Sequence, residues 1–180
     1  SQPQTGDWKI FLWKNNDGEK NTKKETMITK TEYLGNKDLL HQEKIAFLAS
    51  SIISTETVLR VYDWATDMRN HGKCVISGFS SKLEQDVLHF LLKGSQPIIL
   101  VLARRMYKVV PADLQKALDE NRLLIISDCC SIRQSKSTAL ARNKYICDIA
   151  DKILFVGVTE QSSLYGLQQS IDNKQKLITL

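Results

Sequence analysis

The chain has 180 residues, which suits one domain with a sizeable hydrophobic core and leaves room for a small appendage. Its apolar fraction of 42% is ordinary for a globular protein, and no apolar run approaches the roughly 20 residues that a membrane span needs. The net charge of +5 is a mild basic excess, which is compatible with a nucleic-acid partner but far from proving one.

Residues 1–43 form an N-terminal extension with its own pattern. Residues 8–13 (WKIFLW) and 27–34 are rich in β-prone side chains, and a polar stretch separates them. We predict a β-hairpin that lies on or beside the main domain, followed by a short lead-in. The first residues lack the basic start and apolar middle of a secretory signal.

From Lys44 onward, apolar runs alternate strictly with helical stripes, so residues 44–180 are predicted to form one domain. The predicted strands are 44–50, 74–77, 97–103, 123–127, 152–158 and 176–180. The predicted helices cover 58–68, 83–91, a short segment from Pro111, 139–150 and 164–171. Strands that are apolar throughout and joined by helices are typical of a parallel sheet covered on both faces. We therefore predict an α/β fold, a Rossmann-like, doubly wound, mostly parallel sheet.

The cysteines and histidines predict no metal site. The four cysteines contain no C-x-x-C pair, and the three histidines show no ligand spacing. Cys74 and Cys147 sit in apolar patterns and are interpreted as core residues, whereas the Cys129–Cys130 pair is a candidate for thiol reactivity, with an inert buried pair as the alternative. This cysteine usage fits a reducing compartment, and we expect a cytoplasmic protein with no membrane partner.

Common catalytic motifs are missing as well. The chain has no G-x-S-x-G elbow, no G-x-x-x-x-G-K-[ST] loop and no G-x-G-x-x-G fingerprint. Carboxylates near the predicted carboxyl ends of the strands are few (Glu84, Asp128 and Glu160), and their spacing assigns no acid–base pair. We predict no catalytic residue and no cofactor, which argues against an enzyme without closing the question.

All the strand-to-helix connections open at one edge of the predicted sheet, where ligands of such folds bind. Serines, threonines and cations crowd these loops. The cations are Lys82, Arg104, Arg105, Lys108, Arg133, Lys136, Arg142 and Lys144. Each one alone is ordinary for a solvated surface. As a set, beside helix N-termini whose partial charge has the same sign, they predict an anion-binding rim.

The bend SGFSS, at residues 77–81, raises a narrower question, because its backbone N–H groups could hold an anion. Gly78 allows a sharp turn or a close backbone approach. However, Ser81 and Glu84 have the spacing of a capping box, which explains the hydroxyl without any ligand and puts a negative charge at the helix start. The bend indicates a phosphate site only in combination with the basic loops.

With these segments identified, the chain resembles the Rossmann domain of the DNA-processing protein A (DprA/Smf) family, in the superfamily that includes the Lonely-guy phosphoribohydrolases. The resemblance runs from about Leu34 to Leu180. It rests on the order and spacing of KIAFLASS, VISGFSSKLEQDVLHFLL, ARNKYICDIADKILFVGV and EQSSLYGLQQSI. These correspond to the family's first strand, its Ser-Gly strand-turn-helix, its Arg-Asn-Arg helix with the fifth strand, and its Ser-Gly-Ser-Leu turn.

The resemblance implies which residues bind DNA phosphates. The Ser-Gly loop and the Arg-Asn-Arg segment of the family correspond here to Ser77, Gly78, Ser80, Ser81, Arg142, Asn143 and Lys144. Ser50 follows the first strand, and Ser162 and Ser163 replace the Ser-Gly-Ser turn. Together with Lys82, Arg104 and Arg105 from the basic loops, these residues are the predicted site.

Some family positions differ in this chain. The arginine expected after the first strand is Ser51, the arginine of the Ser-Gly loop is Ser81, and the next glycine is Lys82. The glycine-rich P-G-G-x-G-T-x-x-E turn of the phosphoribohydrolases is replaced by VGVTEQSSLYGLQQ, which argues against that reaction.

Several functions stay open at this point. The first is a protein of the DprA type that holds phosphates of single-stranded DNA, in DNA processing or recombination, with slight sequence preference. The second is a nucleotide-binding sensor or degenerate phosphoribohydrolase, and the third is a scaffold that has lost its ligand. Phe79 and Tyr107 are candidate stacking residues, with partly buried packing as the alternative. The oligomeric state is open, and a homodimer would follow the habit of the family.

Overall fold

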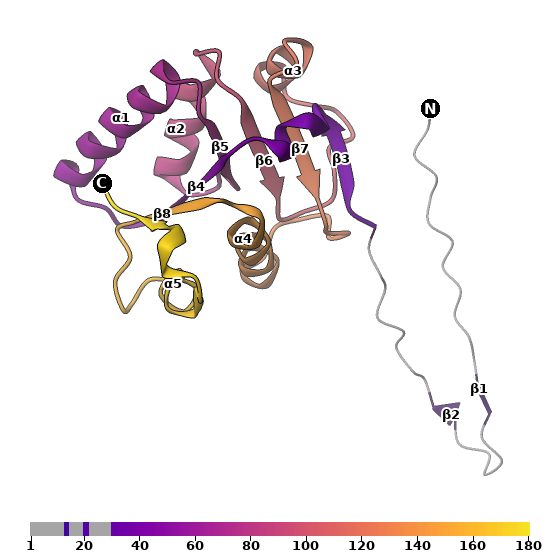
Figure 1. Cartoon of the computed structure of the whole chain (residues 1–180). Helices are drawn as coiled ribbons and strands as arrows, with labels where there is room; N and C mark the ends of the chain where they lie inside the picture. Colours follow the sequence, from indigo (N-terminus) through magenta and orange to yellow (C-terminus); the bar gives the residue numbers. More distant parts are fainter. Residues whose placement is uncertain (1–12, 15–19, 22–29) are drawn as a thin grey trace.

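The computed structural model describes residues 13–14, 20–21 and 30–180, and its main feature is one seven-stranded sheet with the order β3-β7-β6-β5-β4-β8-β9 (Figure 1). Six strands run parallel, and they are β4 (Lys44–Ala49), β5 (Cys74–Ser77), β6 (Ile98–Leu102), β7 (Leu123–Ser127), β8 (Lys152–Val156) and β9 (Leu177–Ile178). The predicted α/β class and the doubly wound parallel sheet are confirmed. The strands form where the sequence has unbroken runs of Ile, Leu and Val, because both faces of the sheet are buried.

Helices cover both faces of the sheet (Figure 1). The elements are α1 (Thr55–Asn70), α2 (Lys82–Leu92), α3 (Ala112–Asp119), α4 (Lys136–Ile149) and α5 (Tyr165–Ser170), with the short 3₁₀ turns η1 (Lys37–His41) and η2 (Lys174–Lys176). Side chains of β6 alternate between two core layers: Ile98, Leu100 and Leu102 pack with α1, α2 and α3, while Ile99 and Val101 pack with α4 and the α5 region. This alternation is the two-residue period of a strand buried on both sides.

Side-chain caps mark the starts of α1 and α2. Ser54 caps α1, and Ser81 with Glu84 forms the predicted capping box of α2. Gly72 follows the end of α1 with a φ of +62°, the left-handed conformation expected of a residue that closes a helix. One helix begins slightly later than predicted, since Pro111 is the N-cap of α3 and not its first helical residue.

The N-terminal region differs from the predicted hairpin. β3 (Glu32–Gly35) pairs antiparallel with β7, with Leu34 opposite Ile125, so this segment is an edge strand of the main sheet. Gly35 has a φ of +105° and lies so close to the carbonyl of Leu123 that a Cβ atom would collide with it. The predicted strand at residues 8–13 falls almost entirely outside the described residues. The pair formed by β1 (Trp13–Lys14) and β2 (Lys20–Asn21) is a separate two-stranded sheet.

The strand order reverses beside β4, because β5 lies on one side of it and β8 on the other. In such sheets the ligand crevice lies at the carboxyl ends of the strands, near this reversal. The loops that follow β4, β5, β6, β7 and β8 all open at that edge. The side chains of these loops therefore surround the expected ligand crevice.

Candidate functional site

The bend between β5 and α2 uses its backbone N–H groups internally. The carboxylate of Glu84, which is only 5% exposed, accepts hydrogen bonds from the N–H of Ser80 at 3.0 Å and of Ser81 at 3.2 Å. Its other oxygen accepts the N–H of Ala49, at the end of β4, at 2.8 Å. The N–H of Phe79 donates to Ser77 Oγ at 3.1 Å. In the SGFSS bend, the carboxylate of Glu84 thus occupies the backbone N–H groups that an external anion would need.

The same bend receives the side chain of Arg142 from α4. Arg142 is only 6% exposed, and its guanidinium donates to Ser80 Oγ at 3.1 Å, to Asn143 Oδ1 at 2.9 Å and to Gln134 Oε1 at 3.4 Å. The guanidinium lies against the Cα of Gly78, where a Cβ atom would overlap it. A glycine is needed here because a buried arginine passes directly over the backbone.

Two opposite charges are therefore buried at one bend. Burial lowers the pKa of Arg142, and the negative charge of Glu84 opposes that shift. Among the described residues no carboxylate lies within ion-pair distance of the Arg142 guanidinium. A buried cation that lacks a direct ion pair is well placed to attract an anionic ligand.

A pocket of about 190 Å³ lies beside Arg142, between the β5–α2 and β6–α3 connections. We call it the Arg104 pocket. Its lining residues are Gly78, Phe79, Ser80, Leu88, Leu100, Leu102, Ala103, Arg104, Tyr107, Leu114, Gln134 and Arg142. The guanidinium of Arg104 lies 5.4 Å from the centre of the Tyr107 ring. Two cations that are far apart in the sequence, Arg104 and Arg142, thus meet at one cavity with the Ser80 hydroxyl.

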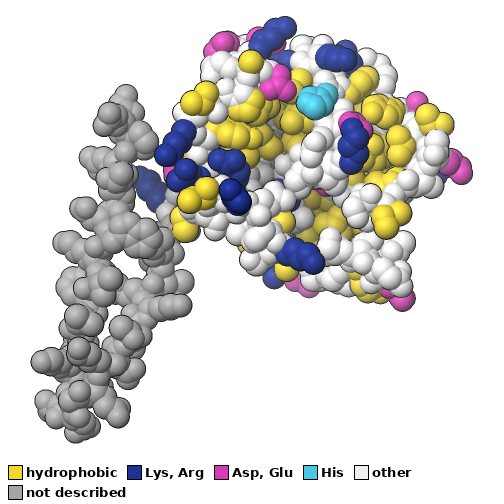
Figure 2. All heavy atoms as spheres, turned by 180° about the vertical axis from the view of Figure 1, so that it is seen from behind, with side chains coloured by type: hydrophobic (Ala, Val, Ile, Leu, Met, Phe, Trp, Pro, Cys, Tyr) yellow, Lys and Arg dark blue, Asp and Glu magenta, His cyan; other side chains and the backbone are white. Residues whose placement is uncertain are grey.

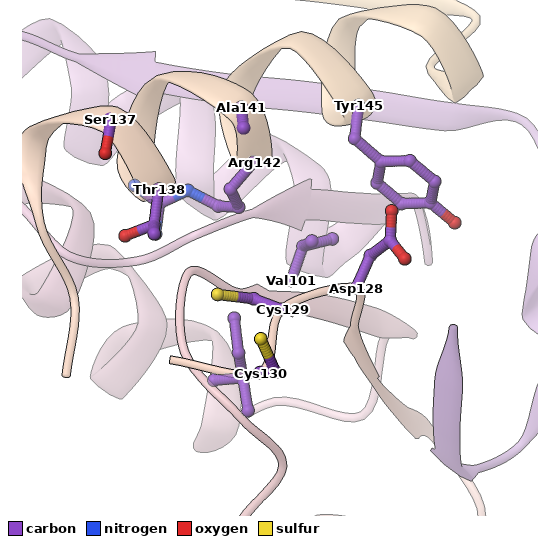
Figure 3. Close-up of a pocket in the computed structure, with 10 residues that line it drawn as sticks. Val101, Asp128, Cys129, Cys130, Ser137, Thr138, Ala141, Arg142 and Tyr145 are labelled. Carbon is purple, nitrogen blue, oxygen red and sulfur yellow. The ribbon is translucent and has the colours of Figure 1, made fainter. Parts of the chain in front are cut away.

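A second pocket, of about 330 Å³, lies between α4 and the ends of β6 and β7 (Figure 3). We call it the α4 pocket. It is lined by Val101, Leu102, Asp128, Cys129, Cys130, Ser137, Thr138, Ala141, Arg142 and Tyr145. Arg142 and Leu102 line both pockets, so the two cavities are neighbours that share these side chains.

Three predicted serines lie at the next strands along the sheet. The hydroxyls of Ser50, after β4, and Ser162, after β8, are 3.2 Å apart, and Ser162 Oγ accepts the N–H of Thr159 at 2.9 Å. The structure therefore brings Ser50 and Ser162 together across the strand reversal. Ser163 is exposed beside them.

Several predicted cations do not join this arrangement. Lys82 is exposed and pairs with Asp86 at 2.8 Å, and this hydrogen bond raises the pKa of Lys82. Arg105 and Lys144 line neither of the two pockets, and Lys144 is exposed. On the face shown in Figure 2, Lys and Arg side chains form several separate groups. The predicted cationic rim is thus concentrated at Arg104 and Arg142.

The structure also locates residues that the sequence did not suggest. Gln134 binds Arg142 and lines the Arg104 pocket, while Tyr145 and Thr138 line the α4 pocket. Spacing could have indicated Tyr145, because it follows Arg142 by three residues on the same helix. Phe79 and Tyr107 both line the Arg104 pocket. Phe79 is only 5% exposed and packs in the core, which favours the packing interpretation, whereas Tyr107 is half-buried.

The structure contains no candidate metal cluster and no candidate membrane span within the part that it describes. No three His, Cys, Asp or Glu side chains gather there as metal ligands would. No described helix has the length and apolar character required to cross a bilayer.

The strand order, with helices on both faces of the sheet, places the chain among the doubly wound, Rossmann-like α/β proteins. Its family follows from the sequence: the chain belongs to the family of DNA recombination-mediator protein A, whose model matches residues 26–180. The resemblance to DNA-processing protein A is thereby confirmed. No curated protein matches the chain.

Solved structures of the same family share the fold. DNA processing protein A from Helicobacter pylori, described as binding single-stranded DNA, superposes with a TM-score of 0.66 at 18% identity, over 84% of this chain and 72% of that chain. DNA processing protein A from Streptococcus pneumoniae gives a TM-score of 0.66 at 19% identity, over 83% of this chain and 54% of that one. A molybdenum cofactor binding protein from Rippkaea orientalis is more distant, with a TM-score of 0.51 and 12% identity over 77% of this chain and 76% of that chain.

Proposed function

We propose that the chain binds single-stranded DNA through its phosphates, at the Arg104 pocket. The observation that carries the proposal is the convergence of Arg104 and Arg142, from two separate connections, on one cavity that also contains the Ser80 hydroxyl. Guanidinium groups are suited to phosphate because their donors match two oxygens at once.

The charges around the cavity support an anionic ligand. Among the described residues neither Arg104 nor Arg142 forms an ion pair with a carboxylate, so their donors are not neutralised in that way. The relative from Helicobacter pylori binds single-stranded DNA, and membership of the family points to a role in DNA processing or recombination. This chain spans about half of the Streptococcus pneumoniae protein. A role of this chain in DNA processing is therefore part of the proposal.

The test is a salt titration of binding to a labelled single-stranded oligonucleotide, followed by fluorescence anisotropy. For single strands the logarithm of the binding constant falls with the logarithm of salt concentration, by about 0.7 for each phosphate contact. We expect Arg104→Ala to weaken binding about tenfold and to reduce that slope by about 0.7.

Lys73→Ala is the matched control, because it removes the same charge from an exposed residue just before β5, at the opposite edge of the sheet. It should leave both the affinity and the slope nearly unchanged. Equal losses in the two variants would mean that only net charge matters, which contradicts a defined site. An absence of oligonucleotide binding even at low salt would refute the function.

A second candidate, a nucleotide-binding sensor, is favoured by the α4 pocket, whose 330 Å³ falls within the size range of small-molecule sites. A thermal-shift comparison separates the two functions. Stabilisation by a mononucleotide, with no response to oligonucleotides, would support the sensor, because only a ligand that binds the folded state raises the melting temperature.

A further inference from the structure

The α4 pocket has walls that suit a flat, partly apolar group. Val101 of β6 lies on one side of it and Ala141 of α4 on the other (Figure 3). Leu102 of β6 also lines it. Tyr145 presents a half-buried phenol ring at one end. Aliphatic floors and aromatic edges are the surroundings in which nucleic-acid bases are held outside a duplex.

The polar groups of this pocket are divided between its ends (Figure 3). Asp128 lies near Tyr145 at one end, whereas Ser137 and Thr138 lie at the other, nearer the first turn of α4. Asp128 is exposed, and among the residues that the structure describes it accepts one hydrogen bond, from Thr31 Oγ1 at 3.1 Å. A carboxylate has about four acceptor positions, so the described residues leave most of those on Asp128 to a ligand.

Arg142 connects the two cavities. Because the Arg142 side chain lines both the Arg104 pocket and the α4 pocket, the two cavities are neighbours, and a strand whose phosphate is held at Arg142 can direct an adjoining base into the second cavity. The ligand end that reaches Asp128 must then be a hydrogen-bond donor, since an ionised carboxylate only accepts.

Guanine fits this requirement better than the other three bases. Its Watson–Crick edge carries two adjacent donors, the ring N1–H and the exocyclic 2-amino group, which can meet both oxygens of one carboxylate. Thymine offers one N–H between two carbonyl oxygens, and cytosine and adenine each pair an amino group with a ring acceptor. Those acceptors would be repelled by a carboxylate.

We propose that the α4 pocket is a nucleobase subsite, in which Asp128 selects guanine from a single strand held at Arg142. This inference rests on the proposed phosphate site. It adds a sequence preference, which phosphate contacts alone do not provide. Two hydrogen bonds to one base edge would favour guanine over another base by roughly fivefold or more in affinity. We use fivefold because Asp128 is exposed.

The experiment compares labelled oligonucleotides of roughly six nucleotides, short enough that few binding registers compete. One is all thymidine, and the others carry a single central deoxyguanosine, deoxyinosine, deoxyadenosine or deoxycytidine. We expect the deoxyguanosine oligomer to bind about fivefold more tightly than the all-thymidine one. Deoxyinosine lacks the 2-amino group, so it should lose about half of that advantage on a logarithmic scale.

The matched variants are Asp128→Asn and Asp148→Asn. Both replace an exposed carboxylate by an amide, but Asp148 lies near the end of α4, outside the pocket lining. We expect Asp128→Asn to abolish the guanine preference while changing all-thymidine binding less than twofold. Asp148→Asn should retain the preference.

Each other outcome has a definite meaning. Equal affinity for all five oligomers, with salt-dependent binding intact, overturns the base subsite and leaves the phosphate site standing. An equal change for every oligomer in Asp128→Asn also overturns it, because the carboxylate would then act only through its charge. If no oligomer binds at low salt, both proposals fail together.

Discussion

Glu84→Gln is the change that most directly tests how the bend after β5 is held. Glu84 is 5% exposed, and its two oxygens accept three backbone N–H groups, from Ala49 at 2.8 Å, Ser80 at 3.0 Å and Ser81 at 3.2 Å. Glutamine has nearly the same shape, but one oxygen becomes an NH₂ group that can only donate. Whichever way the amide is turned, at least one backbone N–H faces another donor.

The expected cost follows from the bonds that are lost. A hydrogen bond to a charged group contributes about 1.5–3 kcal/mol, and a buried donor without a partner costs about 1–3 kcal/mol. The two figures count partly the same loss and are not added, so we expect the free energy of unfolding to fall by about 3 kcal/mol. For a chain of this size that corresponds to a drop in melting temperature of about 9 °C.

Urea unfolding measures this difference directly. Glu160→Gln is the control, because it removes the same charge from an exposed residue in the β8–α5 connection, at the same edge of the sheet. That control should stay within about 0.5 kcal/mol of the wild type. If Glu84→Gln also stayed within that range, the three hydrogen bonds would not be what holds the bend, and the reasoning would be wrong.

Three further predictions concern other parts of the domain. Gly78→Ala should displace the Arg142 guanidinium, weakening oligonucleotide binding about tenfold at a cost of about 1 kcal/mol in unfolding free energy, as measured by anisotropy and urea titration. The backbone N–H of Lys44 lowers the pKa of Asp151, so Asp151→Asn should lower the free energy of unfolding by about 1 kcal/mol at neutral pH. This difference in stability between the variant and the wild type should shrink as the pH falls below about 4 and disappear below the pKa of Asp151 in the folded protein. Burial raises the pKa of the Cys74 and Cys147 thiols to about 12, so a thiol reagent at mildly alkaline pH should label two cysteines in the folded protein and all four after unfolding; fast labelling of all four would contradict this.

The core of the fold could be predicted because its signal is local. Each parallel strand is a short run of apolar residues, and each helix has an apolar stripe, so composition along the chain shows where the elements lie. For β3 the β-prone residues 27–34 indicated a strand, but nothing in them indicated its partner. β3 has four residues, mostly exposed, and it pairs with β7, about ninety positions further along the chain. A short edge strand is defined by its partner and not by its own composition.

The sequence predicted the edge of the sheet at which the candidate site lies, but not which side chains meet there. Strand order puts all the basic loops at one edge, yet only Arg104 and Arg142 reach the same cavity. The direction of each side chain decides this. Arg142 lies four residues before Ile146 on the buried face of α4, whereas Lys144 lies on the opposite, exposed face. That periodicity was present in the sequence and could have separated the two.

The internal carboxylate changes where an anion can bind at this edge. In many folds of this type backbone N–H groups at a helix start hold a phosphate, but here Glu84 occupies those of Ser80 and Ser81. In the proposed site, phosphate is held by side chains instead, chiefly those of the buried Arg142 and of Arg104. Because Glu84 also carries a negative charge close to Arg142, it reduces the positive potential of the cavity. The proposed site should therefore bind phosphate moderately and lose affinity steeply with salt, and under the second proposal its base selectivity comes from Asp128.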